Sequence, residues 1–187
     1  MSNSNEKRVV LGADFAGFPL KEAVKEHLQE RGWEVVDLTP DLDHSDMYHR
    51  VGFQVGAQIS EGNFAKGLLF CGTGMGIHVA ASKCPHVHAA VAESLPAAKR
   101  AATANNCNVL AMGAFFVAPP LGMAMADAFL ESKLGDGYED WEGFYEYHQL
   151  GFEECENFDY EAYRDNGFQL PVAPEIPLGP QPRGLAY

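Results

Sequence analysis

The sequence predicts an α/β protein in which a five-stranded parallel sheet is covered by helices on both faces, giving three layers. Short apolar runs alternate with longer segments of helical spacing, and the connections between them are short. Runs such as Leu68–Phe70 are apolar throughout, which is typical of strands buried on both faces. With 187 residues, of which 47% are hydrophobic, the chain can form one such domain and an extension.

The first elements are defined by apolar spacing and by glycines. Residues 8–11 and 33–38 are short β-rich runs and predict two strands. Residues 18–31 and 46–61 have apolar side chains at every fourth position, and each segment is followed by a glycine. This spacing and this ending predict two helices.

The later elements repeat the pattern. The predicted strands are the apolar runs 67–71, 87–92 and 108–112. The predicted helices are residues 75–82, 95–105 and about 120–130. Pro96 is tolerated because it falls in the first turn of its helix.

The last third of the chain departs from this alternation. We expect a domain over residues 8–133 and an acidic, aromatic C-terminal extension over residues 134–187. From Pro171 onward the density of prolines excludes a helix or a central strand. Two interpretations stay open for this arm: it packs on the domain or on a neighbouring subunit, or it is a frayed tail.

The bulk composition excludes several classes of partner. The formal net charge of −13 argues against nucleic acid and anionic membranes, which require clustered Lys and Arg. The N-terminus lacks the apolar segment of a signal peptide, and no apolar run approaches the ~20 residues of a membrane span. The four cysteines have no CxxC or zinc-ligand spacing. We therefore expect a cytoplasmic protein with reduced thiols and no metal site.

The most informative segment begins where an apolar run ends at Cys71. Alternating glycines follow at Gly72, Gly74 and Gly76, and they lead into a helix-compatible sequence. The start of a helix presents unpaired N–H groups and a partial positive charge, which favour anions and thiolates. Cys71 is thus a candidate nucleophile or base, with a buried inert thiol as the alternative.

Polar residues follow two other predicted strands, namely Asp14 after the first and Glu93–Ser94 after the fourth. Ligands of open parallel sheets bind beyond the carboxyl ends of the strands, so we expect these residues and Cys71 to line one crevice. Asp14 is a candidate for substrate contact or for capping the next helix. The glycine spacing G-x-G-x-G differs from the dinucleotide-binding pattern, which makes a nucleotide-binding regulatory module a weaker hypothesis.

Three motifs together resemble the type B ribose-5-phosphate isomerase family, which includes the galactose-6-phosphate isomerase subunits. They are Gly12-Ala13-Asp14-Phe15-Ala16-Gly17-Phe18, Cys71-Gly72-Thr73-Gly74-Met75-Gly76 and Asn105-Asn106-Cys107-Asn108-Val109-Leu110-Ala111-Met112-Gly113. The resemblance covers residues 8–133 and implies a Rossmann-like fold. It also implies a homodimer or dimer of dimers that interconverts aldose and ketose phosphates through a cis-enediolate, without metal or cofactor.

The resemblance further implies roles for individual residues. Cys71 matches the base that moves a proton between C1 and C2, and Thr73 belongs to the site that stabilises the enediolate oxyanion. These two are the expected catalytic residues. The expected substrate-binding residues are Asp14, Tyr48, Gly72, Gly74, Met75, Gly76 and Asn105.

The sequence departs from the family pattern at three places. Phe15 replaces the histidine beside the aspartate, and Ala104 replaces the histidine assigned to ring opening. The phosphate-binding arginines have no counterpart, because residues 135–141 are acidic and aromatic. The substrate is therefore expected to differ from ribose 5-phosphate.

The favoured hypothesis is an isomerase of another sugar, which is unphosphorylated, too short to need ring opening, or held through its phosphate by Lys99, Arg100 or Arg50. The alternative is a non-catalytic or partner-dependent subunit of a hetero-oligomeric isomerase. In either case the expected ligand is a small sugar or sugar phosphate.

Overall fold

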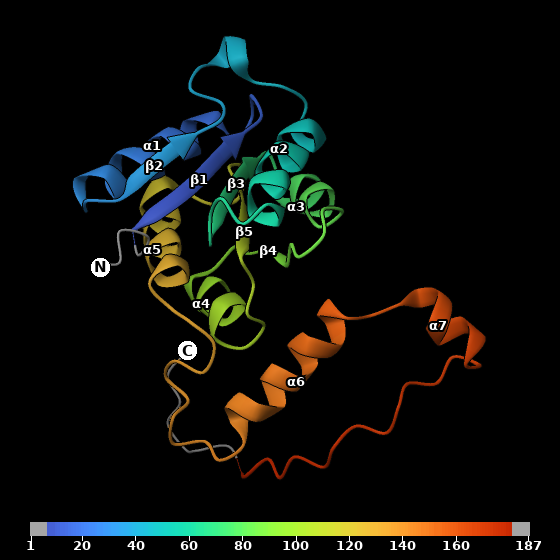
Figure 1. Cartoon of the computed structure of the whole chain (residues 1–187). Coiled ribbons are helices and arrows are strands. Elements are labelled where there is room, and N and C mark those ends of the chain that lie inside the picture. The colour runs from blue at the N-terminus through green and yellow to red at the C-terminus, as the bar shows by residue number, and fades with distance from the viewer. Residues whose placement is uncertain (1–6, 181–187) are drawn as a thin grey trace, which may run out of the picture. The chain divides into compact units, whose positions relative to one another are not determined.

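A five-stranded, fully parallel sheet with the order β2-β1-β3-β5-β4 forms the centre of the first part of the chain (Figure 1). The computed structural model describes residues 7–180. The strands are β1 (Arg8–Ala13), β2 (Glu34–Asp37), β3 (Gly67–Cys71), β4 (Ala89–Val91) and β5 (Val109–Gly113). The predicted Rossmann-like α/β fold is confirmed, with β4 shorter than its apolar run suggested.

The helices between the strands cover both faces of the sheet. They are α1 (Phe18–Glu30), α2 (Tyr48–Ser60), α3 (Met75–Ala81), α4 (Leu95–Thr103) and α5 (Pro119–Leu130), and a short 3₁₀ turn, η1, spans Leu42–His44. Side chains alternate between the faces of a strand, so neighbouring residues enter different cores. Phe70 packs with α1 and α5, whereas Cys71 packs with α2 and α3. This places the candidate base on the α2–α3 face.

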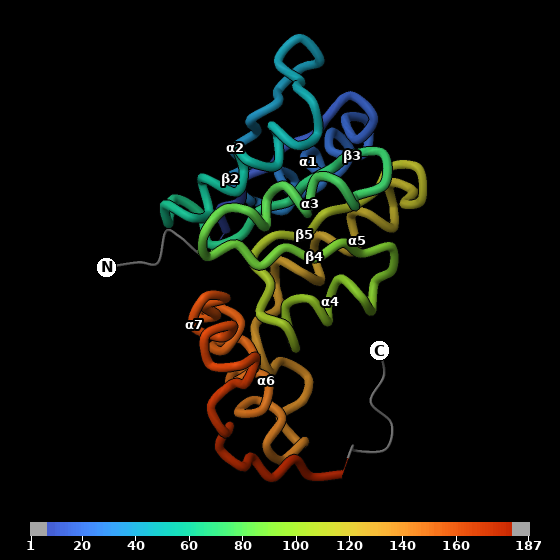
Figure 2. The backbone as a smooth tube through the Cα atoms, turned by 90° about the vertical axis from the view of Figure 1, so that its right-hand side faces the viewer, coloured from blue at the N-terminus to red at the C-terminus, as the bar shows by residue number. Residues whose placement is uncertain are grey.

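The described residues divide into two compact units, one of residues 7–102 and 107–132 and the other of residues 103–106 and 133–180. The second unit contains two helices that the sequence did not indicate, α6 (Phe144–Glu156) and α7 (Tyr160–Asp165). Figure 2 traces them and the extended segment that follows α7. Among residues 7–180, no helix is long and apolar enough to cross a membrane.

A small aromatic cluster organises the start of the extension. Phe144 is buried and stacks on Tyr138 with ring centroids 4.1 Å apart. The proline-rich segment, which forms neither helix nor strand up to residue 180, returns to this cluster. There the Trp141 indole N–H donates to the carbonyl of Gly179 at 2.7 Å. Packing of the arm on a neighbouring subunit stays a prediction.

Candidate active site

Cys71 is the last residue of β3 and lies in the middle of the sheet, between β1 and β5. Its side chain is buried, and its Sγ accepts a hydrogen bond from the backbone N–H of Gly74 at 3.0 Å. A backbone donor therefore fixes the position of the sulfur at the start of the turn.

The turn after Cys71 depends on a glycine. Gly74 has φ of +76°, and a Cβ at this position would lie 2.8 Å from Cγ2 of Val91. Its conformation turns the Gly74 N–H back toward Cys71 and opens α3, a helix of seven residues. The next amide, of Met75, donates to Oγ1 of Thr73 at 3.3 Å. The Gly74 amide, which belongs to the expected substrate-binding turn, thus donates to the sulfur of Cys71 in this structure.

Asp14 follows β1 and is joined directly to the end of β3. Its N–H donates to the carbonyl of Phe70 at 3.1 Å, and its Oδ1 accepts hydrogen bonds from Ala16 and Gly17 at 3.0 and 2.9 Å. A Cβ on Gly17 would lie 2.2 Å from the carbonyl carbon of Phe70, so only glycine allows this close approach. The structure therefore brings the Asp14 turn to the residue that precedes Cys71.

The carboxyl group of Asp14 is in an unusual environment. Burial raises its pKa above the ordinary aspartate value, and the two amide hydrogen bonds only partly oppose this effect. Asp14 is not the N-cap of α1, because Gly17 occupies that position without a side-chain cap. The buried carboxylate is thus held by a turn at the edge of the sheet, as a group that contacts ligand would be.

Two aromatic rings flank the Cys71 turn. A Cβ on Gly76 would lie 2.6 Å from the Tyr48 ring, and a Cβ on Gly72 would lie 2.5 Å from the Phe115 ring. Tyr48 begins α2 and is half-exposed, while Phe115 follows β5 and is 69% exposed. Phe115 was not among the residues predicted from the sequence, although its place just beyond a strand end could have indicated it.

The remaining predicted residues follow β4, begin α3 or lie in the turn after α4. Glu93 and Ser94 follow β4, the edge strand that β5 separates from β3, and Val91 at the end of β4 lies against Gly74 of the Cys71 turn. Ser94 accepts a hydrogen bond from the N–H of Ala97 at the start of α4. Met75 is exposed, and Asn105 is exposed in the turn after α4.

The described residues offer no site for a metal ion: within residues 7–180 no group of three or more His, Cys, Asp or Glu side chains has the arrangement that a metal needs. His44 pairs with Asp41 at 2.6 Å, and that hydrogen bond raises the pKa of His44. His78 bonds to the carbonyl of Met75 in its own turn at 2.6 Å.

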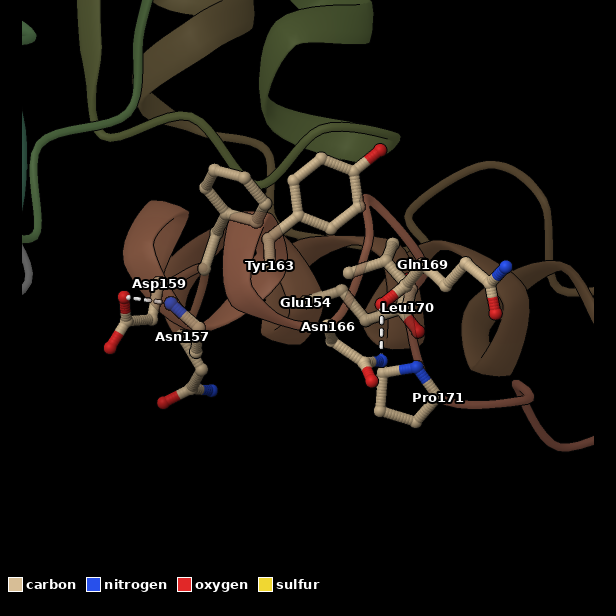
Figure 3. Close-up of a pocket in the computed structure, with 10 residues that line it drawn as sticks. Glu154, Asn157, Asp159, Tyr163, Asn166, Gln169, Leu170 and Pro171 are labelled. Atoms are coloured by element: carbon tan, nitrogen blue, oxygen red, sulfur yellow. Dashed lines mark hydrogen bonds between the residues drawn. The ribbon is translucent and has the colours of Figure 1, made fainter.

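A pocket of about 400 Å³ lies in the second unit, between α6, α7 and the segment that follows α7 (Figure 3). Its lining includes Phe158, Tyr163 and Leu170. The rings of Phe158 and Tyr163 have centroids 5.5 Å apart. The pocket contains none of the predicted site residues, so the Cys71 turn remains the candidate site.

Several known proteins with the same fold or a related sequence are sugar isomerases. The solved structure of ribose-5-phosphate isomerase B from Mycoplasma genitalium with bound ribulose-5-phosphate has a TM-score of 0.71 and 30% identity, over 83% of this chain and 96% of that one. A 4-deoxy-4-sulfo-D-erythrose isomerase from Clostridium sp. (strain MSTE9) is 36% identical over 135 residues, 72% of this chain and 85% of the relative. A D-erythrulose-4-phosphate isomerase from Pectobacterium atrosepticum is 32% identical, over 69% and 86% respectively.

The fold and these relatives define the protein as an aldose–ketose isomerase. The family model described as Ribose/Galactose Isomerase matches residues 9–142, which include Asp14, Tyr48, the Cys71 turn and Asn105. The chain belongs to this family. The resemblance drawn from the three motifs is thereby confirmed.

Proposed function

We propose that this protein interconverts an open-chain four-carbon aldose and its ketose, with an anionic group at C4, by moving a proton between C1 and C2. Cys71 acts as the base, and the intermediate is a cis-enediolate. The observation that carries the choice of substrate is Ala104, at the position where the family resemblance places the ring-opening histidine. Ala104 has no group that can donate or accept a proton.

The chemistry of four-carbon sugars explains why that loss is tolerable. A pentose 5-phosphate closes a five-membered ring through its C4 hydroxyl, and the ring has to open before C1 and C2 can exchange a proton. A tetrose with phosphate or sulfonate at C4 has no C4 hydroxyl, so it cannot close this ring. The names of the two sequence relatives describe substrates of this kind.

The geometry around Cys71 supports the proton transfer. The buried sulfur of Cys71, held in place by the Gly74 N–H, is positioned to remove a proton from the carbon next to a carbonyl. The Thr73 hydroxyl and the Met75 N–H, only 3.3 Å apart, can both turn to the developing oxyanion. Asp14 offers its carboxylate to a substrate hydroxyl, because Oδ2 has no hydrogen-bond partner within residues 7–180.

The anionic group at C4 requires a cation, and the family arginines are absent. Arg50 stands in the first turn of α2, two residues after Tyr48. Its side chain is exposed and, among residues 7–180, forms one ion pair, to Asp46 at 3.5 Å. We propose Arg50 as the residue that receives this group, in preference to Lys99 and Arg100 farther along α4. Replacing Arg50 by Met should raise KM for a charged tetrose and leave KM for the uncharged tetrose unchanged.

The proposal is tested with erythrose 4-phosphate, 4-deoxy-4-sulfo-erythrose and ribose 5-phosphate in deuterium oxide, with NMR reporting turnover and deuterium at C1 or C2. We expect turnover of a C4-substituted tetrose and little of ribose 5-phosphate. Cys71→Ala should lower kcat by about 10²–10⁴-fold. Cys155→Ser, at an exposed cysteine of the extension, is the matched control and should be fully active. Turnover of ribose 5-phosphate alone, or an active Cys71→Ala variant, would refute the proposal.

A partner-dependent subunit remains the second candidate, because the histidine and the arginines that are missing here could come from a paralogous chain. We expect instead a homodimer or a dimer of dimers that is active alone. Light scattering of the purified protein, followed by the same assay, separates the two. An inactive homo-oligomer that gains activity with a paralogue would favour the second candidate.

A further inference from the structure

Both backbone polar groups of Ala13, the residue before Asp14, are held by side chains, while the N–H of Asp14 itself pairs with β3. The last backbone hydrogen bond between the first two strands runs from the N–H of Leu38 to the carbonyl of Leu11 at 3.0 Å. Beyond it, the buried N–H of Ala13 donates to Oγ1 of Thr39 at 2.9 Å. The carbonyl of Ala13 accepts from the hydroxyl of Ser45 at 3.3 Å. Both polar groups of this peptide residue are thus satisfied by the connection between β2 and α2.

Thr39 is itself held on several sides. It is completely buried, and its carbonyl accepts a hydrogen bond from Nζ of Lys21 at 2.6 Å. Its N–H donates to Oδ1 of Asp37 at 3.0 Å. Lys21 is also completely buried and donates to Oδ2 of Asp37 at 2.7 Å. The threonine therefore has a fixed place between a buried ammonium and a carboxylate.

Burying a lysine side chain costs free energy because its ammonium group loses its hydration. Taking an ammonium out of water is compensated only when its hydrogen bonds are well formed, and apolar residues of similar volume are often as stable. Burial opposes the charge on Asp37, yet the hydrogen bonds from Lys21 and Lys25 outweigh it and lower the pKa of this carboxyl. The carboxylate of Asp37 therefore stays charged, and Asp37 and Lys21 both hydrogen-bond to the backbone of Thr39.

We propose that Thr39 is a positioning residue: its hydroxyl, fixed by Lys21 and Asp37, sets the Ala13 peptide and through it the direction of the Asp14 carboxylate. The inference rests on the proposed function, in which Asp14 contacts the substrate. Asp14 Oδ1 is occupied by two amides, so a small displacement of the Ala13 backbone changes where Oδ2 can meet a sugar hydroxyl.

The test compares Thr39→Val, which keeps the shape and removes the hydroxyl, with Thr39→Ser, which keeps the hydroxyl. We expect Thr39→Val to lower kcat/KM roughly 10-fold or more, the effect of a misplaced hydrogen bond to a charged group, and Thr39→Ser to stay within about 3-fold. The same substitution is made in an Asp14→Asn background. If Thr39 acts through Asp14, Thr39→Val costs much less activity there.

A second experiment does not depend on turnover: ¹³C NMR follows the titration of the Asp14 carboxyl as the pH is varied. Thr39→Val should move its titration toward that of an exposed aspartate, while Thr39→Ser should leave it in place. An unchanged titration in Thr39→Val, or an equal activity loss with and without Asp14, overturns the inference. If the wild-type protein turns over none of the sugars, the proposed function fails and the titration alone decides the role of Thr39.

Discussion

The Gly74 turn gives the sharpest test of how the candidate site is built. Gly74→Ala places a methyl group 2.8 Å from Cγ2 of Val91 in a residue with φ of +76°. The left-handed conformation costs about 1–2 kcal/mol for alanine. Forcing a methyl group into packed surroundings costs about 1–3 kcal/mol more. We expect the free energy of unfolding to fall by about 2–5 kcal/mol in total.

Gly32 supplies a matched control. It has φ of +81°, but a Cβ there would have nothing within 4 Å, so Gly32→Ala carries the conformational cost without the clash. Urea unfolding is followed by Trp33 fluorescence in a Trp141→Phe background, because Trp33 is buried in the core of the first unit. Gly74→Ala should be about 1–3 kcal/mol less stable than Gly32→Ala.

Activity separates the two variants further. A displaced Gly74 amide no longer meets Sγ of Cys71, so Gly74→Ala should lose turnover while Gly32→Ala keeps it. Adding Val91→Ala to Gly74→Ala should recover part of the stability, because the clashing methyl group is removed. Equal stability and equal activity of the two alanine variants would refute this account of the turn.

Three further predictions concern charge and burial. Asp14→Asn should lower kcat/KM while leaving measurable turnover, and it should raise Tm at pH 7. The raised pKa means that the folded protein binds the Asp14 proton more tightly than the unfolded chain, so ionisation weakens the fold as pH rises above 3.8. The gain should vanish below that pH, and a lower Tm at pH 7 would contradict it. Burial raises the pKa of Cys107 to about 11, so iodoacetamide at pH 8 should label Cys155 and spare Cys107 until urea unfolds the chain; prompt native labelling of Cys107 would count against this. Lys66→Met should lower unfolding free energy by about 1.5–3 kcal/mol with kcat unchanged, because Nζ of Lys66 donates to the carbonyls of Phe129 and Ser132 at the end of α5. An unchanged urea midpoint would show that these bonds contribute nothing.

The strands and the Cys71–Asp14 pair could be predicted from the sequence for a simple reason. Strands buried on both faces leave uninterrupted apolar runs, and parallel strands bring their carboxyl ends to one edge. The order of the strands within the sheet, by contrast, leaves no recognisable pattern in the sequence. With β5 inserted between β3 and β4, Phe115 comes to lie on the Cys71 turn, and no local pattern reveals this.

Two other features could not be predicted from the sequence, each for its own physical reason. The helix α6 buries only Phe144, so it lacks the apolar stripe by which helices are recognised. The bond from Ala13 to Thr39 depends on β1 continuing past the last pairing with β2, and such an offset appears only in three dimensions. The sequence motifs therefore predicted the residues that carry the chemistry. They did not predict the hydrogen bonds that hold those residues in place.

The bond between Trp141 and Gly179 closes a loop of the chain 38 residues apart in sequence. A shortened protein that ended anywhere inside this loop would lack Gly179, so the Trp141 indole N–H would lose its hydrogen-bond acceptor. It would also uncover Gly143, whose backbone lies against the carbonyl of Pro177. Shortening for crystallisation or for fusion therefore has two sensible limits, either before Trp141 or after Gly179, and none between them.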